Sequence, residues 1–486
     1  MLERIKQHDA APTRTARLAA FVSLLLVLAA TVILLAVPAR ATAPERNDAH
    51  VARSHSTHQF LSASQAITHT AFLPLMPRGH MLQAGEWFGV QVYALGDTPN
   101  RHLVELGAGW IRIPLSWSQV EPANTTPEYY QWSTQLDAEL AALSRQGVHT
   151  ILTLTGNPGW AATYPAGPID RTDLSELVEF MEAAVAHYGM PPYSVKHWEF
   201  YNEPDNGDDY FAGLGEVGYF GYTPAAYVDI LQAVYDPIKQ VDPEAQVVFG
   251  GIAYDAWDDP WGGPFVKTFL DEVLRLGGGD YFDLMNFHYY FAFADNWQEY
   301  GIDIVGKTKH LREKLASYGV DKPFICTETG MLSNGDGGKE TQARYVPQVI
   351  ARSRSVDLDT VIWFSLVDSS VLGAQLWGLV DPAYIPKPSY TAYQVAVDQL
   401  RWTTFVQTVR ADGEMEVYEF ETSRARVVVA WSNDDLSHDL ALDAAQLVRV
   451  DKSGNETVIR DGDDGLEDGV IHVTIDPSPV YLRSDR

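Results

Sequence analysis

Two glutamates follow short apolar segments that the sequence predicts to be buried strands. Glu203 comes after residues 195–201, and Glu328 comes directly after residues 323–327. A pair of carboxyl groups suits the cleavage of an acetal, because one protonates the leaving oxygen while the other attacks or stabilises the cationic carbon. The two must lie in different environments, so that one is protonated and the other ionised near neutral pH. We therefore predict that both residues are catalytic.

Other polar and aromatic side chains lie where neighbouring predicted strands end. An arginine lowers the pKa of a nearby carboxylate, and aromatic rings pack against the C–H faces of sugars. A lone histidine or loop tryptophan is often only a packing residue, which is the alternative for each of these. Beside the two glutamates, we predict that the following residues bind substrate: Arg112, Asn157, Trp160, Asn202, His288, Tyr290 and Trp363. Further tryptophans in predicted loops are expected to line the cleft or to anchor the loops: Trp117, Trp257, Trp261, Trp297 and Trp377.

A third carboxyl group, that of Glu199, precedes Glu203 by four residues. Successive side chains of a strand point to opposite faces, so Glu199 shares a face with Tyr201. A carboxylate in a protein interior needs a partner or stays neutral. We expect Glu199 to pair with Arg112, and a neutral, hydrogen-bonded acid is the alternative.

Strand and helix patterns alternate eight times between residues 85 and 400. The helices are bounded by signals such as Thr98-Pro99 at a start and Gly107 at an end. Eight such units predict a closed α/β barrel, the (β/α)8 or TIM barrel, with its active site at the carboxyl ends of the strands. A doubly wound open sheet is the rival fold, but the sequence lacks the Gly-rich turn expected after its first strand. The predicted strands span residues 87–92, 110–114, 149–155, 195–201, 246–250, 281–288, 323–327 and 360–366.

The pattern changes after residue 400. Short runs of alternating or β-branched residues are separated by turn signals such as Asp412-Gly413, which predicts a small all-β sandwich domain over residues 401–486. Because no catalytic cluster is apparent there, this domain is expected either to bind glycan or to brace the barrel. The runs span residues 416–420, 426–431, 447–450, 457–459 and 470–475.

The amino terminus has the pattern of an export signal. Basic residues precede an apolar run over residues 18–37, and Ala39-Arg40-Ala41 resembles a cleavage site. The apolar run is also long enough to span a bilayer. We expect residues 1–41 to be a signal peptide or an N-terminal membrane anchor, and the rest to be exported, either secreted or anchored outside the cell membrane. Residues 42–84 lack periodicity and are expected to form a linker or arm.

The composition excludes several classes of function. The 486 residues include 64 acidic and 35 basic side chains, and the net charge is -29. This charge would repel phosphate backbones, so a nucleic-acid partner is not expected. The single cysteine, Cys326, excludes an internal disulfide and a thiolate zinc site. No metal-ligand spacing or phosphate-binding loop is apparent, so no metal or cofactor is expected, and the acidic runs 205–209 and 461–468 are interpreted as solvated turns.

Several segments resemble the signatures of clan A glycoside hydrolases, in the same order along the chain. Residues 198–204 (WEFYNEP) resemble the strand-four signature, in which a glutamate after an asparagine is the general acid/base. Residues 323–330 (PFICTETG) resemble the strand-seven segment that carries the nucleophile. Residues 155–161 (TGNPGWA) are most similar to the strand-three loop of glycoside hydrolase family 39 and its relatives. Further matches are Trp110-Ile111-Arg112, His288-Tyr289-Tyr290 and Val361-Ile362-Trp363-Phe364.

This resemblance implies a retaining O-glycosyl hydrolase that acts on β-glycosidic bonds of an oligo- or polysaccharide. Glu203 would be the acid/base and Glu328 the nucleophile, with Tyr290 donating a hydrogen bond to Glu328. A carbohydrate is the implied substrate, and membrane contact is expected only through the N-terminal segment. A carbohydrate-binding protein without catalysis and a transglycosylase on the same fold are the alternatives.

Overall fold

The computed structural model describes residues 87–207, 218–254, 265–291, 297, 299–369, 376–463 and 465–485. The signal or anchor predicted over residues 1–41 and the linker predicted over residues 42–84 lie outside these ranges. Within the described residues, no helix combines the length and the apolar character that a membrane crossing requires.

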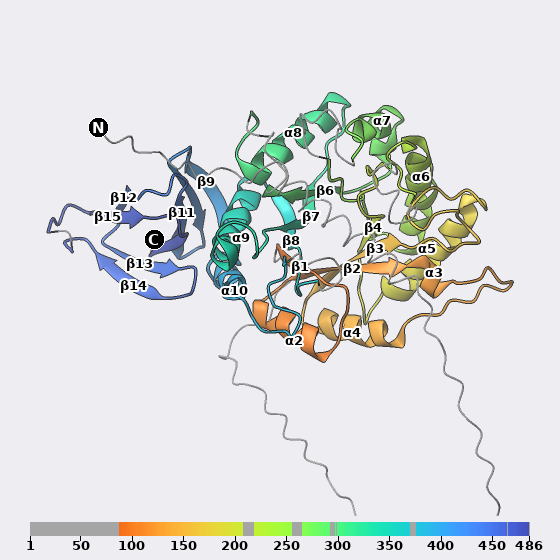
Figure 1. The fold of residues 1–486 in the computed structure, drawn as a ribbon, viewed down its shortest axis with the longest axis horizontal. Coiled ribbons are helices and arrows are strands. Elements are labelled where there is room, and N and C mark those ends of the chain that lie inside the picture. Colours follow the sequence, from red (N-terminus) through yellow and green to blue (C-terminus); the bar gives the residue numbers. More distant parts are fainter. Residues whose placement is uncertain are drawn as a thin grey trace, which may run out of the picture. The chain divides into compact units, whose positions relative to one another are not determined.

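Eight parallel strands form the larger sheet, in the hydrogen-bonded order β5-β4-β3-β2-β1-β8-β7-β6. Parallel bridges between Val248 and Leu284 and between Ile252 and Phe287 join its two edges. The sheet is therefore closed, and the predicted (β/α)8 barrel is confirmed (Figure 1). Its strands are β1 (Phe88–Gln91), β2 (Trp110–Ser116), β3 (His149–Thr155), β4 (His197–Phe200), β5 (Gln246–Val248), β6 (Met285–Tyr290), β7 (Phe324–Gly330) and β8 (Leu358–Trp363).

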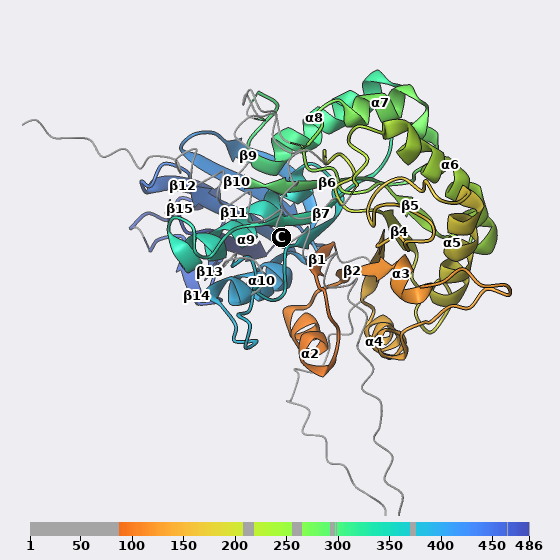
Figure 2. The ribbon, with the colours of Figure 1, turned by 45° about the vertical axis from the view of Figure 1, so that its right-hand side comes forward.

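Helices surround the strands, as the two views of the ribbon show (Figures 1 and 2). Several of their ends follow the sequence signals, but α2 begins at Asp97, before the predicted cap Thr98, and Gly96 precedes it. The Ser133 hydroxyl accepts a hydrogen bond from the Leu136 N–H at the start of α4, and α2 ends at Gly107, whose φ of +69° suits glycine. The helices are α2 (Asp97–Leu106), α3 (Trp117–Val120), α4 (Thr134–Arg145), α5 (Leu174–Tyr188), α6 (Pro224–Val241), α7 (Phe269–Arg275), α8 (Asp303–Ser317), α9 (Gly338–Ser355) and α10 (Pro388–Leu400).

Apolar side chains fill the interior of the barrel. Ile151, Val248, Leu284, Ile325 and Ile362 form a cluster separate from the larger one that includes the helices. These residues lie in or directly beside strands spread around the barrel, on the inner face of the sheet, so they meet across the barrel axis. Because layers of side chains fill the interior of such a barrel, chemistry is confined to the strand ends.

The carboxyl-terminal region is all-β, as predicted. A six-stranded antiparallel sheet has the order β14-β13-β16-β11-β10-β9, and β12 pairs with β15. Met415 and Val428 of the first sheet share one apolar cluster with Leu440 and Val473 of the second, so the sheets pack as a sandwich. Strands β9, β12 and β16 were not predicted from the sequence. The strands are β9 (Thr404–Ala411), β10 (Met415–Glu421), β11 (Ala425–Ser432), β12 (His438–Asp443), β13 (Gln446–Asp451), β14 (Glu456–Arg460), β15 (Val470–Ile475) and β16 (Val480–Asp485).

A buried ion network connects α9 to the sandwich. Arg352 donates to both oxygens of Glu416, at 2.5 and 2.9 Å, and to Asp303 Oδ2 at 2.8 Å. Its guanidinium carbon also lies 5.2 Å from the ring centroid of Trp431. Both carboxylates are buried, and Arg352 is the cation that pairs with each of them among the described residues.

Candidate active site

Arg112, on β2, bonds to several groups at the carboxyl end of the barrel. A guanidinium has five N–H donors in one plane. Two bonds go to Glu199, at 2.5 and 3.0 Å. The others reach Gln91 Oε1 at 3.0 Å, Asn202 Oδ1 at 2.7 Å and Glu328 Oε1 at 2.6 Å. Every donor of the buried guanidinium therefore has a fixed acceptor.

The predicted pairing of Glu199 with Arg112 is confirmed. The Glu199 carboxylate is fully buried. It also accepts hydrogen bonds from Thr153 Oγ1 at 2.6 Å, Asn286 Nδ2 at 2.7 Å and Thr327 Oγ1 at 3.2 Å. All of these partners donate, so both oxygens of Glu199 act as acceptors, as they do in a carboxylate. The alternative of a neutral acid does not fit this set of donors.

Glu203 lies in a strained turn just beyond β4. Tyr201 and Glu203 have φ values of +63° and +48°, in the left-handed region that residues other than glycine enter at a cost. The Glu203 C=O accepts a hydrogen bond from the Asn206 N–H at 3.0 Å, and a parallel bridge joins Asn202 to Gly251. Strained backbone of this kind persists only where the surrounding contacts impose it, and it is found most often at functional sites.

Glu328 lies on β7, and both of its oxygens accept hydrogen bonds. Arg112 Nη1 donates to Oε1 at 2.6 Å, and the Tyr290 hydroxyl donates to Oε2 at 2.8 Å. The bond from Tyr290 confirms what the motif resemblance implies. In the parallel pairing of β6 with β7, His288 is the register partner of Glu328, so the sheet itself places the imidazole beside the carboxylate.

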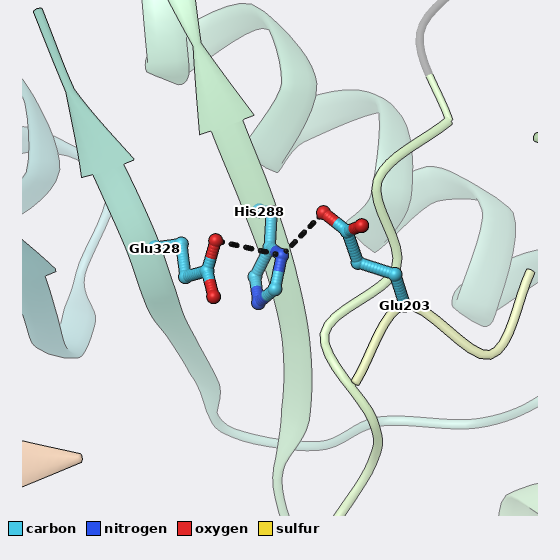
Figure 3. Close-up of side chains that lie close together, drawn as sticks. All are labelled: Glu203, His288 and Glu328. Carbon is cyan, nitrogen blue, oxygen red and sulfur yellow. Dashed lines mark hydrogen bonds and ion pairs between the residues drawn. The ribbon is translucent and has the colours of Figure 1, made fainter. Parts of the chain in front are cut away.

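His288 lies between the two glutamates, and both carboxyl groups face its ring (Figure 3). Its Nδ1 is 3.0 Å from Glu203 Oε1 and 3.5 Å from Glu328 Oε2. One nitrogen or oxygen from each of the three side chains lies within 4.8 Å of the other two. The barrel thus brings together three residues from the ends of β4, β6 and β7.

Burial shifts the pKa of each member of this trio in the direction that favours its neutral form. Burial and the carboxylates of Glu328 and Asp205 raise the pKa of Glu203 well above its usual value. Burial also raises the pKa of Glu328, but Arg112 opposes that rise. Burial and the charge of Arg112 hold the pKa of His288 well below its usual value, so the imidazole is neutral. The two carboxyl groups therefore differ in their surroundings: the nearest carboxylates add to the rise in the pKa of Glu203, whereas Arg112 and Tyr290 oppose the rise in the pKa of Glu328.

The same trio is the only group of described residues whose ligand-type atoms are close enough to surround a metal ion. Both oxygens of Glu328 already accept bonds from a guanidinium and a hydroxyl, and the charge of Arg112 would repel a second cation. The 3.0 Å between His288 Nδ1 and Glu203 Oε1 is a hydrogen-bond distance. The arrangement fits proton transfer better than metal coordination.

Asn157, a predicted substrate ligand, holds the loop after β3. Its Nδ2 donates to the C=O groups of Gly167 at 2.9 Å and Tyr164 at 3.3 Å. Its Oδ1 accepts from the Tyr201 hydroxyl at 2.9 Å. These contacts tie the loop to the strained turn before Glu203, and direct contact of Asn157 with substrate stays a prediction.

The predicted substrate tryptophans are bonded to backbone carbonyl groups. Trp160 Nε1 donates to the Glu121 C=O at 3.2 Å, and Trp363 Nε1 donates to the Trp377 C=O at 3.2 Å. The ring of Trp160 is partly exposed, whereas that of Trp363 is buried. Contact with a sugar stays a prediction for both. Of the other loop tryptophans, Trp117, Trp297 and Trp377 are buried, and Trp257 and Trp261 lie outside the described residues.

Tyr93 is a site residue that the sequence analysis missed. It follows β1 and is half-buried, and its ring meets Phe364 edge-on with the centroids 6.1 Å apart. Burial and the Glu328 carboxylate raise the pKa of its phenol well above the usual value, which places the hydroxyl within electrostatic range of Glu328. Its position at a strand end is the signal that could have identified it.

The interpretation of residues 205–209 as a solvated turn is wrong for Asp205, which is fully buried. The carboxyl group accepts hydrogen bonds from the backbone N–H groups of Ala253, at 3.1 Å, and Tyr254, at 2.8 Å. Burial raises the pKa of Asp205 to about 7, although these bonds oppose the rise. Lys307, also missed, is buried and donates to the His288 C=O at 2.8 Å. Both residues act on the pKa of Glu203, which the Asp205 carboxylate raises and the Lys307 ammonium lowers.

Solved structures of glycoside hydrolases share this fold. A family 39 glycoside hydrolase from Bacteroides cellulosilyticus is similar with a TM-score of 0.63 at 22% identity, over 83% of this chain and 81% of that one. A family 30 endoxylanase from Clostridium papyrosolvens has a TM-score of 0.58 at 13% identity, over 83% and 97%. A β-xylosidase from Caulobacter crescentus has a TM-score of 0.55 at 17% identity, over 82% and 97%. At these identities the likeness concerns the fold.

No curated protein sequence matches this chain. Residues 80–366 match the sequence model of the cellulase family, which is glycosyl hydrolase family 5. This match covers more than half of the chain and includes both glutamates of the site. It confirms the resemblance to clan A, and family 39 is represented among the structural neighbours. The chain therefore belongs to glycosyl hydrolase family 5 of clan A, whose members cleave glycosidic bonds.

Proposed function

We propose that the chain is a retaining glycoside hydrolase that cleaves β-glycosidic bonds of an oligo- or polysaccharide, with Glu203 as acid/base and Glu328 as nucleophile. One observation carries this proposal: a carboxyl oxygen of Glu203 lies within 4.8 Å of one of Glu328. Retaining glycosidases hold these groups about 5–5.5 Å apart, whereas inverting enzymes need about 6.5–9.5 Å to admit a water molecule. The short separation supports direct attack by Glu328.

In the first step, a Glu328 oxygen attacks the anomeric carbon, and the bond from that carbon to the glycosidic oxygen breaks. The carboxyl proton of Glu203 moves to the departing oxygen, and a glycosyl ester forms on Glu328. Two features of the site support these roles. Arg112 and Tyr290 donate to Glu328 and favour its anion, while burial and nearby carboxylates favour the protonated form of Glu203.

In the second step, the Glu203 carboxylate takes a proton from a water molecule, whose oxygen attacks the same anomeric carbon. The ester bond breaks, and its electron pair returns to Glu328 as a carboxylate. The hydrogen bonds from Arg112 at 2.6 Å and Tyr290 at 2.8 Å stabilise that charge as it develops. Two inversions leave the product with the β configuration of the substrate.

The substrate class and location belong to the same proposal. The structural neighbours include an endoxylanase and a β-xylosidase, so β-xylosides and β-glucosides are the first substrates to test. A polysaccharide does not cross a membrane, so an enzyme that degrades one must act outside the cell. This requirement agrees with the export signal predicted in residues 1–41.

Azide rescue of the full-length protein tests the proposed roles. We expect Glu328→Ala to abolish turnover of aryl β-glycosides, and azide to restore it with formation of the α-glycosyl azide. Azide then occupies the space of the missing carboxylate. We expect Glu203→Ala to retain activity only on substrates with an acidic leaving group, such as 2,4-dinitrophenol. Glu244→Ala, at a side chain that is 80% exposed, is the control and should behave like the unsubstituted protein.

The anomer released first decides between mechanisms. We expect proton NMR to show the β anomer before mutarotation. The α anomer would overturn the proposal, as would failure of azide to rescue Glu328→Ala. A carbohydrate-binding protein would bind the glycosides without product, and a transglycosylase would transfer the sugar to an added oligosaccharide in preference to water.

A further inference from the structure

The hydroxyl group of Thr327 lies at the junction of three polar side chains. Asn286 Nδ2 is 2.8 Å away, His288 Nε2 is 3.2 Å away and Glu199 Oε1 is 3.2 Å away. A threonine hydroxyl has one proton to donate and two lone pairs that accept. It can satisfy all three neighbours in one way only, if one of them accepts and the other two donate.

The orientation of Asn286 identifies the first donor. Its Oδ1 accepts a hydrogen bond from the Thr327 backbone N–H at 3.1 Å. Its Nδ2 therefore faces both the Thr327 hydroxyl, at 2.8 Å, and Glu199 Oε1, at 2.7 Å. Since an amide NH2 group only donates, Asn286 uses one lone pair of the hydroxyl.

The Glu199 carboxylate identifies the direction of the hydroxyl proton. It accepts only, so Thr327 must donate to it across the 3.2 Å between the two oxygens. If the proton turned to His288 instead, the lone pairs of these two oxygens would face each other at that distance. The remaining lone pair of Thr327 then accepts from Nε2–H of His288, at 3.2 Å.

We propose that Thr327 is a positioning residue that holds neutral His288 in the tautomer with its proton on Nε2. Nδ1 is then a bare acceptor, at hydrogen-bond distance from Glu203 Oε1 (3.0 Å) and farther from Glu328 Oε2 (3.5 Å), an oxygen that already accepts from Tyr290. It can form a hydrogen bond there only with the protonated carboxyl group, because a carboxylate would bring two lone pairs together. The arrangement therefore retains the proton that the acid delivers, and this inference rests on the proposed role of Glu203 as acid/base.

The environment agrees with a neutral ring and a neutral Glu203. Burial, together with Arg112 and Lys307, keeps the pKa of His288 well below its usual value, so the ring carries one proton. A hydrogen bond to the neutral form of an acid raises its pKa, and Glu203 is shifted in that direction. The charged or titratable groups around this pair are Tyr93, Arg112, Glu199, Asp205, Tyr290, Lys307 and Glu328.

Substitution of Thr327 by valine tests the proposal, because valine keeps the shape and removes the hydroxyl. Without the Thr327 hydroxyl, the proton of His288 moves from Nε2 to Nδ1. The Nδ1–H group then donates to the Glu203 carboxylate and lowers the pKa of Glu203. We expect the alkaline limb of the kcat/KM profile to move to lower pH by about one unit. This is the effect of one hydrogen bond that stabilises the protonated Glu203 in the unsubstituted protein and the ionised Glu203 in the variant. Thr327→Ser keeps the hydroxyl and is expected to retain the alkaline limb of the unsubstituted enzyme.

Leaving-group dependence separates this role from a general loss of structure. Protonation of the leaving oxygen speeds cleavage of a phenyl β-glycoside, but it has little effect on a 2,4-dinitrophenyl β-glycoside, whose leaving group departs as an anion. We therefore expect Thr327→Val to lose more activity on the phenyl substrate, by about tenfold above the alkaline limb. Equal losses on both substrates, or an unmoved limb, would overturn the proposal.

Neutron diffraction of the unsubstituted full-length protein reads the tautomer without any turnover. We expect deuterium on Nε2 of His288 and on a carboxyl oxygen of Glu203, with none on Nδ1. Deuterium on Nδ1 overturns the inference even if the protein is an active glycosidase. Absence of turnover on every glycoside tested would instead defeat the proposed function, while the deuterium positions would still report on Thr327.

Discussion

The guanidinium of Arg112 and the carboxylate of Glu199 meet in a two-bonded ion pair inside the barrel, with distances of 2.5 and 3.0 Å. The same guanidinium reaches Glu328 with another donor, at 2.6 Å. Glu199 is thus one step removed from the reaction. It holds the cation that opposes the burial-induced rise in the pKa of Glu328, so in the proposed mechanism Glu199 supports the nucleophile and needs no contact with substrate to do so.

Glu199→Gln is expected to destabilise the protein by about 3–5 kcal/mol, the cost of removing one partner from a buried ion pair. The new NH2 group also faces donors, because Arg112 Nε and Asn286 Nδ2 both point at this side chain. Urea unfolding measures the loss. Glu244→Gln is the control, since Glu244 is 80% exposed beside Lys196 and should cost at most about 1 kcal/mol. Equal stability of the two variants would contradict the proposed role of Glu199.

Asp205→Asn is expected to move the alkaline limb of activity to lower pH. The proposed mechanism needs Glu203 protonated, so activity falls as pH rises through the pKa of that group. Burial is the largest cause of the high pKa of Glu203, and the carboxylates of Glu328 and Asp205 raise it further. Removal of one negative charge therefore lowers this pKa, and the limb moves with it, by roughly half a unit to one unit.

Asparagine suits this test because one oxygen of Asp205, Oδ2, accepts from the N–H groups of both Ala253, at 3.1 Å, and Tyr254, at 2.8 Å, while Oδ1 accepts only a second, longer bond from Ala253, at 3.2 Å. An amide oxygen in the place of Oδ2 keeps these two bonds while the charge and the longer bond to Oδ1 are lost. The measurement is the pH profile of kcat/KM on a phenyl β-glycoside. Asp280→Asn, at an exposed position, should leave the limb in place, and a shift to higher pH in Asp205→Asn would refute the assignment.

The strands that are buried on both faces could be predicted from the sequence. They appear as short runs of apolar or β-branched residues that recur between the helix patterns. The predicted run at residues 149–155 and strand β3 (His149–Thr155) coincide. Strand β9 (Thr404–Ala411) was missed for the opposite reason. It is an edge strand, and most of its side chains are exposed, so neither an apolar run nor an alternation marks it.

The strand-end rule identifies residues of the site but not the contacts that decide what each one does. Arg112 and Glu199 share an interior face, so their pairing could be predicted. Asp205 could not be interpreted correctly, because its partner amides lie 48 and 49 residues further along the chain. Composition makes an acidic run look solvated, and only the fold shows that the loop after β5 covers this one carboxyl group.

Tyr93→Phe is expected to lower kcat/KM by about 10- to 100-fold, the value of a hydrogen bond to a charged or reacting group. The hydroxyl makes no hydrogen bond to the described residues but lies within electrostatic range of Glu328 and Arg112. It is therefore available to a sugar hydroxyl. Thermal unfolding should be unchanged, because the ring and its edge-on contact with Phe364 are kept. Tyr129→Phe, at a side chain that is 66% exposed, is the control, and equal activity of the two variants would exclude this role for Tyr93.

Arg352→Met tests whether the sandwich braces the barrel. The arginine bonds to Glu416 of the sandwich at 2.5 and 2.9 Å and to Asp303 of the barrel at 2.8 Å. Methionine keeps much of the volume but leaves two buried carboxylates without a cation. We expect a loss of about 3–5 kcal/mol in unfolding free energy, measured by urea unfolding. The unfolding of both domains should shift, since the network belongs to both.

Two further variants serve as controls for Arg352→Met: one removes a surface arginine, and the other also neutralises the two buried carboxylates. Arg410→Met removes the partly buried partner of Asp412, an exposed residue, from a surface ion pair and should cost at most about 1 kcal/mol. Adding Asp303→Asn and Glu416→Gln to Arg352→Met should recover part of the stability, because the penalty comes from uncompensated charge rather than from lost packing. If Arg352→Met is no worse than Arg410→Met, the network does not brace the barrel. Recovery in the triple variant would show that the loss in Arg352→Met comes from the two uncompensated carboxylates, so that the three buried charges stabilise the contact between barrel and sandwich as one set.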